Sequence, residues 1–123
     1  MNPYPQRLAR IQSAMRAVME TMAEGKTTPA QICDFVLGRI RADGFGPWYM
    51  VLGLGHALGL AVHEDPRLKP GFDEPVRAGM LYTLEPKNWK PGEFHVPCED
   101  MVLVGAERAT ALTNFSHEPN FLP

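Results

Sequence analysis

The residue pattern changes sharply at Gly46-Pro47, and this change limits the chain to folds that combine helices with a sheet. Before it, apolar residues recur at helical spacing; after it, they gather in short segments bounded by proline and glycine. The expected strands are Trp48–Leu54, Leu58–Val62, Met80–Leu84 and Met101–Val104, separated by turns at Pro66, Pro70-Gly71, Ala78-Gly79 and Pro91-Gly92. This order predicts an α+β domain in which two helices pack on one face of a mainly antiparallel sheet.

Two helices are expected before Gly46. From Gln6 to Glu24 apolar residues recur every three or four positions, which predicts an amphipathic helix that stops at Gly25. The second helix is expected to run to Asp43-Gly44, because Thr28 and Gln31 have the spacing of a capping box and Pro29 suits a first turn. Its predicted buried face is Ile32, Phe35, Val36 and Ile40.

Length and charge narrow the possible functions. A chain of 123 residues fits one domain with its own core, so residues 1–123 are expected to form a single domain with a loose tail at 114–123. The formal charge of −2 provides no basic surface for nucleic acid or acidic lipid. No apolar run approaches the roughly 20 residues of a membrane span, and residues 1–9 do not resemble a signal peptide.

The two cysteines, Cys33 and Cys98, are far apart in the sequence and form no CxxC pattern. Buried, reduced thiols are the expected state, and they suit a reducing compartment. We therefore expect the protein to be cytoplasmic.

Four polar residues stand in or beside strand-like segments, namely His56, His63, Glu85 and Glu99. A carboxylate in a half-buried strand is costly unless it is paired or bound to a cation. One imidazole and two carboxylates are a reasonable ligand set for Zn, Mn, Fe or Co. Taken alone, however, His56 between Gly55 and Ala57 also fits a hydrogen-bonded structural histidine.

The order and spacing of four motifs add to this interpretation. They are Gly55-His56-Ala57-Leu58-Gly59, then Val62-His63-Glu64, then Gly79-Met80-Leu81-Tyr82-Thr83-Leu84-Glu85-Pro86, and finally Glu99 to Val104. Together they resemble the C-terminal part of the methionine aminopeptidase, aminopeptidase P and prolidase superfamily. The segment Val62-His63-Glu64-Asp65-Pro66 is similar to the Xaa-Pro peptidase branch.

The resemblance implies a role for each of the four polar residues. His56, Glu85 and Glu99 would be metal ligands for Mn, Zn, Co or Fe, with Glu99 bridging two ions. Glu85 would also assist proton transfer, and His63 would contact the substrate. In the family a metal-bound water or hydroxide attacks the peptide carbonyl.

The chain also departs from the family pattern. Two further aspartate ligands precede the first helix in the family, whereas Asp34 and Asp43 match nothing in that pattern. We therefore expect at most one ion per chain, or none. Ala57 replaces the usual glycine, and His95-Val96-Pro97-Cys98 lacks the usual arginine, with Pro97 implying a strand edge or bulge.

The resemblance also implies a partial fold. A complete pita-bread domain has two similar α/β halves, and this chain corresponds to the C-terminal half. Half of a sheet exposes an edge and an apolar face. We expect a second copy, as a homodimer, or another chain that supplies the missing half to cover them.

Three functions follow from the sequence. The first is a metallopeptidase-like hydrolase of the Xaa-Pro aminopeptidase or prolidase type, acting on small peptides and nearly inactive as an isolated chain. The second is a non-catalytic pita-bread module that binds a protein. The third is a metal-free hydrolase resembling creatinase, in which His56 or a glutamate acts as acid or base.

Overall fold

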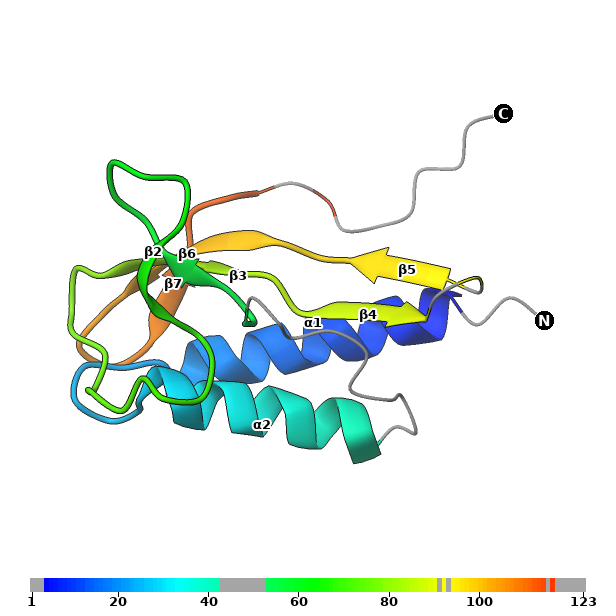
Figure 1. The fold of residues 1–123 in the computed structure, drawn as a ribbon, viewed down its shortest axis with the longest axis horizontal. Helices are drawn as coiled ribbons and strands as arrows, with labels where there is room; N and C mark the ends of the chain where they lie inside the picture. Colours follow the sequence, from blue (N-terminus) through cyan, green and yellow to red (C-terminus); the bar gives the residue numbers. More distant parts are fainter. Residues whose placement is uncertain (1–3, 43–52, 91, 93, 115, 117–123) are drawn as a thin grey trace.

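The computed structural model describes residues 4–42, 53–90, 92, 94–114 and 116. Two helices lie side by side and both cover the same side of the strands (Figure 1). Five strands form an antiparallel sheet, and a further pair extends from it. The predicted α+β arrangement, with helices on one face of the sheet, is confirmed.

Helix α1 spans Tyr4–Thr21 and buries one face, as its spacing predicts. The predicted stop at Gly25 is wrong, since the helix ends at Thr21. The chain leaves the helix there because Ala23 forms a parallel bridge with Gly105 at the sheet. Gly25 instead adopts a φ of 70° and donates its N–H to the carbonyl of Val76, so it serves a turn after the helix.

Helix α2 spans Pro29–Ala42 and begins with the predicted capping box. The Thr28 N–H donates to Oε1 of Gln31 at 3.0 Å, and the Gln31 N–H donates to Oγ1 of Thr28 at 3.2 Å. The expected end at Asp43-Gly44 lies outside the described residues.

The predicted buried face of α2 needs one correction. Ile32 and Val36 are buried, but Phe35 is 38% exposed and Cys33 takes its place in the core. The guanidinium of Arg39 lies 5.1 Å from the centre of the Phe35 ring, so a cation–π contact covers that side chain. The side chain of Ile40 lies outside the described part.

The main sheet has the strand order β2-β1-β3-β6-β7, with all neighbours antiparallel. Its strands are β1 (His56–Ala57), β2 (Glu64–Arg67), β3 (Leu81–Leu84), β6 (Asp100–Val104) and β7 (Ala109–Ala111). A second sheet pairs β4 (Lys87–Lys90) with β5 (Phe94–Pro97). The strands predicted at Met80–Leu84 and Met101–Val104 are thus confirmed as β3 and β6.

Two other strand predictions fare differently. Leu58–Val62 is wrong, because these residues form the loop between β1 and β2, with Leu60 and Val62 exposed to solvent. Residues 48–52 of the segment Trp48–Leu54 lie outside the described residues, and Leu54 is buried without being in a strand.

Pro66 is part of a strand and does not mark a turn as predicted. It lies in β2, the outermost strand on one side of the sheet. An edge strand tolerates proline because one side of its backbone has no partner to receive an N–H. Pro97 lies at the end of β5, in a two-stranded sheet where each strand is an edge, which agrees with the prediction for that residue.

The core lies between the helices and the main sheet. Along β3, Tyr82 and Leu84 are buried in it, and Val102 and Val104 of β6 join them. Successive strand residues point to opposite faces, so Leu81 and Thr83 belong to the face away from the helices. That second face carries the residues of interest for chemistry. Within the described part of the chain, no helix is long and apolar enough to cross a bilayer.

Candidate metal centre

His56 stands at an irregularity in the sheet. It pairs with Arg67 of β2, whereas its neighbour Ala57 pairs with Glu64, so the register shifts between these two residues. A bulge of this kind redirects one side chain relative to the regular ladder. His56 is buried at 8% exposure, which restricts its imidazole to one environment.

Strand β3 holds the backbone on either side of His56. The His56 N–H donates to Oγ1 of Thr83 at 3.1 Å. Residue 55 must be glycine here, because a Cβ on Gly55 would lie 1.9 Å from the carbonyl oxygen of Thr83. The close approach of β1 to β3 therefore depends on Gly55 and fixes the place of His56.

The tautomer of His56 follows from its contacts. Its Nδ1 lies 2.9 Å from the carbonyl oxygen of Ala57, and a carbonyl oxygen only accepts hydrogen bonds, so Nδ1 carries a proton. In neutral imidazole, Nε2 then presents a lone pair. Ala57 supplies this acceptor from its main chain, so the departure from the family's glycine leaves this contact intact.

Glu85 faces that lone pair. Its Oε1 lies 3.2 Å from Nε2 of His56, and both side chains are mostly buried. The Glu85 N–H donates to the carbonyl of Leu54, which anchors the residue directly after β3. A lone pair and a carboxylate oxygen repel each other at this distance unless a proton or a cation lies between them.

The geometry fits a metal ion as well as a proton. Two ligands about 2.0 Å from a tetrahedral ion lie about 3.3 Å apart, which matches the 3.2 Å between Nε2 of His56 and Oε1 of Glu85. The hydrogen bond from Nδ1 to a backbone carbonyl is also the usual way in which a metal-binding histidine is oriented. His56 and Glu85 therefore have the chemistry of two ligands of one ion.

Glu99 lies opposite Glu85 along the paired strands. Leu84 pairs with Asp100 on one side of a two-residue break, and Lys87 pairs with Pro97 on the other, so the register is unchanged across it. The break contains Glu85-Pro86 on one strand and Cys98-Glu99 on the other. Like charges directly across an antiparallel pair are destabilising, and a shared cation would offset that repulsion.

The structure brings together two of the three predicted ligands in direct contact. Glu99 is exposed, and among the described residues no group of three or more His, Cys, Asp or Glu side chains is arranged to hold a metal ion. The ligand roles of His56, Glu85 and Glu99 therefore stay predictions.

His63 lies beside this pair. Its ring centre is 4.6 Å from that of His56, in an edge-to-face arrangement with 61° between the planes. His63 is exposed to solvent, unlike His56. A solvent-facing imidazole next to the buried His56 is accessible to a substrate, and the substrate contact of His63 stays a prediction.

Thr83 and Glu64 make contacts in this region that local sequence does not predict. Thr83 supports His56, and Glu64 accepts a hydrogen bond from the Ala61 N–H through Oε1 at 2.7 Å. Thr83 belongs to the motif that ends at Glu85, so the sequence indicated that it lies near the site. The sequence did not indicate its contact with His56, because the two residues are 27 positions apart and lie in different strands.

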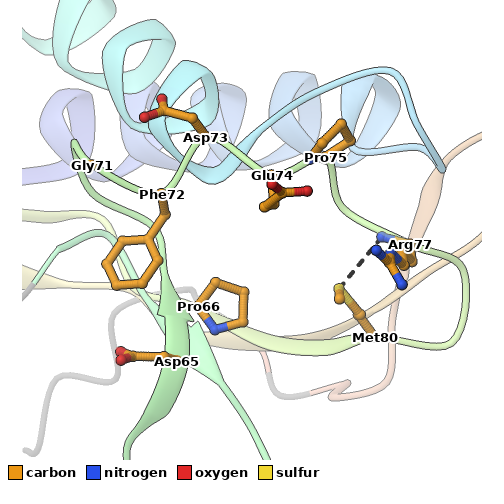
Figure 2. Close-up of a pocket in the computed structure, with 9 residues that line it drawn as sticks. All are labelled: Asp65, Pro66, Gly71, Phe72, Asp73, Glu74, Pro75, Arg77 and Met80. Atoms are coloured by element: carbon orange, nitrogen blue, oxygen red, sulfur yellow. Dashed lines mark hydrogen bonds between the residues drawn. The ribbon is translucent and has the colours of Figure 1, made fainter.

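A separate hollow of about 400 Å³ lies between β2 and residues 71–80 (Figure 2). Its walls are largely apolar, with Pro66, Phe72 and Met80 facing the space, and the Arg77 N–H donates to Sδ of Met80 at 3.4 Å. None of the four predicted site residues lines this hollow. It is therefore distinct from the candidate metal centre.

The profile of metallopeptidase family M24 matches residues 3–106. The chain belongs to this family. The family is one of metallopeptidases, which implies use of a divalent metal. The resemblance predicted from the four motifs is confirmed.

Relatives with curated descriptions are similar over most of this chain. It is 32% identical over 118 residues to the probable dipeptidase PepE of Mycobacterium bovis, covering 96% of this chain and 31% of that protein. It is also 32% identical over 112 residues to the Xaa-Pro dipeptidase of Lactobacillus delbrueckii, covering 90% of this chain and 30% of that protein. The chain thus spans about a third of the length of these relatives.

The fold comparison agrees. Prolidase from Pyrococcus furiosus superposes with a TM-score of 0.84 at 27% identity, covering 94% of this chain and 34% of that one. The M24 member described here therefore has part of the pita-bread fold, as predicted.

Proposed function

We propose that this chain supplies His56, Glu85 and Glu99 to the metal centre of a hydrolase that cleaves small Xaa-Pro peptides. The observation that carries the proposal is the contact between Nε2 of His56 and Oε1 of Glu85 at 3.2 Å, with Nδ1 already committed to a backbone carbonyl. Membership of a metallopeptidase family supports it, as does the similarity to Xaa-Pro dipeptidases of several organisms.

Each side chain has a distinct task in this proposal. His56 and Glu85 would hold the ion from the buried side, and Glu99 would approach from the opposite strand. Glu85 would also take up or return a proton through its carboxylate, while His63 would orient the peptide from the solvent side. A bound divalent ion polarises the peptide carbonyl and lowers the pKa of its water ligand.

With three protein ligands and water, one divalent ion per chain is the expected limit. Mn, Zn, Co and Fe all accept this mixture of imidazole and carboxylate. We also propose that a second copy of the chain covers the sheet face that carries these residues, and that the protein works in the cytoplasm. The free, buried Cys33 and Cys98 support a reducing compartment.

Metal binding tests this proposal directly. We expect the chain to bind Mn²⁺, Co²⁺ or Zn²⁺ at up to one ion per chain, measured by calorimetry and by metal analysis after dialysis. His56→Ala and Glu85→Gln should each weaken binding at least tenfold. Glu107→Gln, an exposed glutamate in the turn between β6 and β7, is the matched control and should leave binding unchanged.

Turnover of Xaa-Pro dipeptides separates the proposed hydrolase from its alternatives. Metal-dependent turnover, lost in His56→Ala, supports the hydrolase. A chain that binds no metal and cleaves no dipeptide would instead be a protein-binding module. Turnover that survives chelation would point to a metal-free, creatinase-like hydrolase.

A further inference from the structure

The loop between β1 and β2, residues 58–63, leaves nearly all of its side chains exposed. Ala57 pairs with Glu64 and closes the loop of residues 58–63, which projects from the sheet on the side away from the helices (Figure 1). Residues 59–63 are all exposed, with Leu60 107% and Val62 77% accessible. Apolar packing therefore does not hold this loop.

The carboxylate of Glu64 fills the inner side of the loop instead. Its Oε1 accepts the Ala61 N–H at 2.7 Å, a short hydrogen bond strengthened by the negative charge. The carboxylate also lies against Gly59, since a Cβ on that glycine would fall 2.1 Å from Oε2. One side chain thus contacts the loop backbone at two points.

His63 is the last residue of the loop held by Glu64. His63 precedes Glu64 and places its ring 4.6 Å from the ring of His56. His56 is fixed independently, by Thr83 and by the bulge in β1. The geometry of the histidine pair therefore depends on what holds the loop.

We infer that Glu64 is a positioning residue, whose carboxylate fixes loop 58–63 through Ala61 and Gly59 and thereby holds His63 beside His56. The functional meaning of this role rests on the proposed hydrolase, in which His63 orients the peptide. The positioning itself is a property of the metal-free chain and can be measured without metal or substrate.

Three variants test the inference by NMR on the metal-free protein. Glu64→Ala removes the acceptor, so amide exchange at Ala61 should accelerate at least tenfold and the nuclear Overhauser effect between the two histidine rings should fall by half or more. Glu64→Gln keeps an acceptor oxygen and should restore much of both signals. Asp65→Asn, at the exposed neighbour that pairs with Arg67, is the control and should change neither.

Gly59→Ala offers a second approach if Glu64→Ala does not fold. The added methyl group displaces the carboxylate while its charge remains, so Ala61 exchange should again accelerate at least tenfold. Unchanged Ala61 exchange and an unchanged ring contact in both Glu64→Ala and Gly59→Ala would overturn the inference.

Metal and activity measurements keep the two proposals apart. Since His56, Glu85 and Glu99 are intact in Glu64→Ala, its metal content should equal that of the wild type, while turnover per bound metal should fall. If metal binding is normal but the NMR signals do not change in the variants, only the positioning role of Glu64 is refuted. If the NMR signals change as expected but no metal binds, only the proposed metal-dependent hydrolase is refuted.

Discussion

Cys33 and Cys98 are buried thiols whose ionisation opposes the folded state. Burial raises the pKa of Cys33 to about 11, and the nearby carboxylate of Asp34 adds to the effect. Burial likewise raises the pKa of Cys98 to about 11, with a smaller contribution from Asp100. Both thiols start from a value of 9.0, so the folded chain keeps these protons over a pH range in which the unfolded chain loses them.

The sign of the pH dependence follows from this difference. Between about pH 9 and about pH 11 the unfolded state binds fewer protons, so the free energy of unfolding should fall as pH rises. The stabilisation that the two thiols provide by staying protonated in the folded chain is fully present below about pH 9. Urea unfolding at pH 8, 9.5 and 10.5 measures the slope, and Cys98→Ser should reduce it because serine does not ionise. An equal slope in the variant would contradict the assignment to Cys98.

At the level of single residues, the sequence identifies side chains better than their partners. His56, His63 and Glu85 could be selected because imidazoles and carboxylates are unusual in apolar segments, and the structure brings these three together. The supporting contacts could not be predicted. The bond from His56 to Thr83 depends on strand register, which local sequence does not specify.

At the level of elements, the sheet depends on a close approach between β1 and β3 at Gly55. A Cβ there would meet the backbone of Thr83, which cannot move aside as a flexible side chain can. We expect Gly55→Ala to lower the free energy of unfolding by about 1–3 kcal/mol, the usual cost of overpacking a tight site. It should also weaken metal binding, because His56 is the next residue.

Gly38→Ala provides the matched control with the opposite sign. Gly38 lies inside α2, and a Cβ there would meet nothing within 4 Å. Alanine in a helix interior is favoured over glycine by about 0.5–1 kcal/mol. Urea unfolding of both variants should therefore give shifts in opposite directions, and two destabilising shifts of equal size would show that Gly55 has no special role.

Element boundaries show where local patterns suffice. The capping box at Thr28 is a short-range signal, and it sets the start of α2 as predicted. The end of α1 depends on a bridge from Ala23 to the distant Gly105, which no local pattern reports. Strand β2 was missed because its residues are charged or proline, and a strand at the sheet edge needs little apolar character.

At the level of the whole molecule, the helices of the described residues cover one face of the main sheet and leave the other face without helices. The helices cover the face of Tyr82 and Leu84. Directly paired residues share a face, so Leu81 and Leu103 lie together on the other one. The Leu112 N–H continues the ladder to the carbonyl of Met101, which places Leu112 on that face as well.

This second face combines apolar exposure with the candidate site. Leu103 is 36% exposed and Leu112 is 51% exposed. By the same alternation Thr83 belongs to this face. Glu85 comes directly after β3 and Glu99 directly before β6, and the strand register places them opposite each other. Exposed apolar side chains on the same sheet face as a site favour an interaction surface there. Covering it would also reduce the access of water to the site.

We expect the cover to be a second copy of the chain, which sedimentation velocity at micromolar concentration would detect as a dimer. Leu103→Glu and Leu112→Glu should each weaken association at least tenfold, about 1.4 kcal/mol, because each would place an unpaired charge in the interface. Phe35→Glu, at a residue of similar exposure on α2, should leave the dimer intact, since the helices lie on the opposite side of the sheet. A wild-type chain that stays monomeric at tens of micromolar would show that self-association does not cover this face, and a different polypeptide segment would then have to supply the apolar contacts.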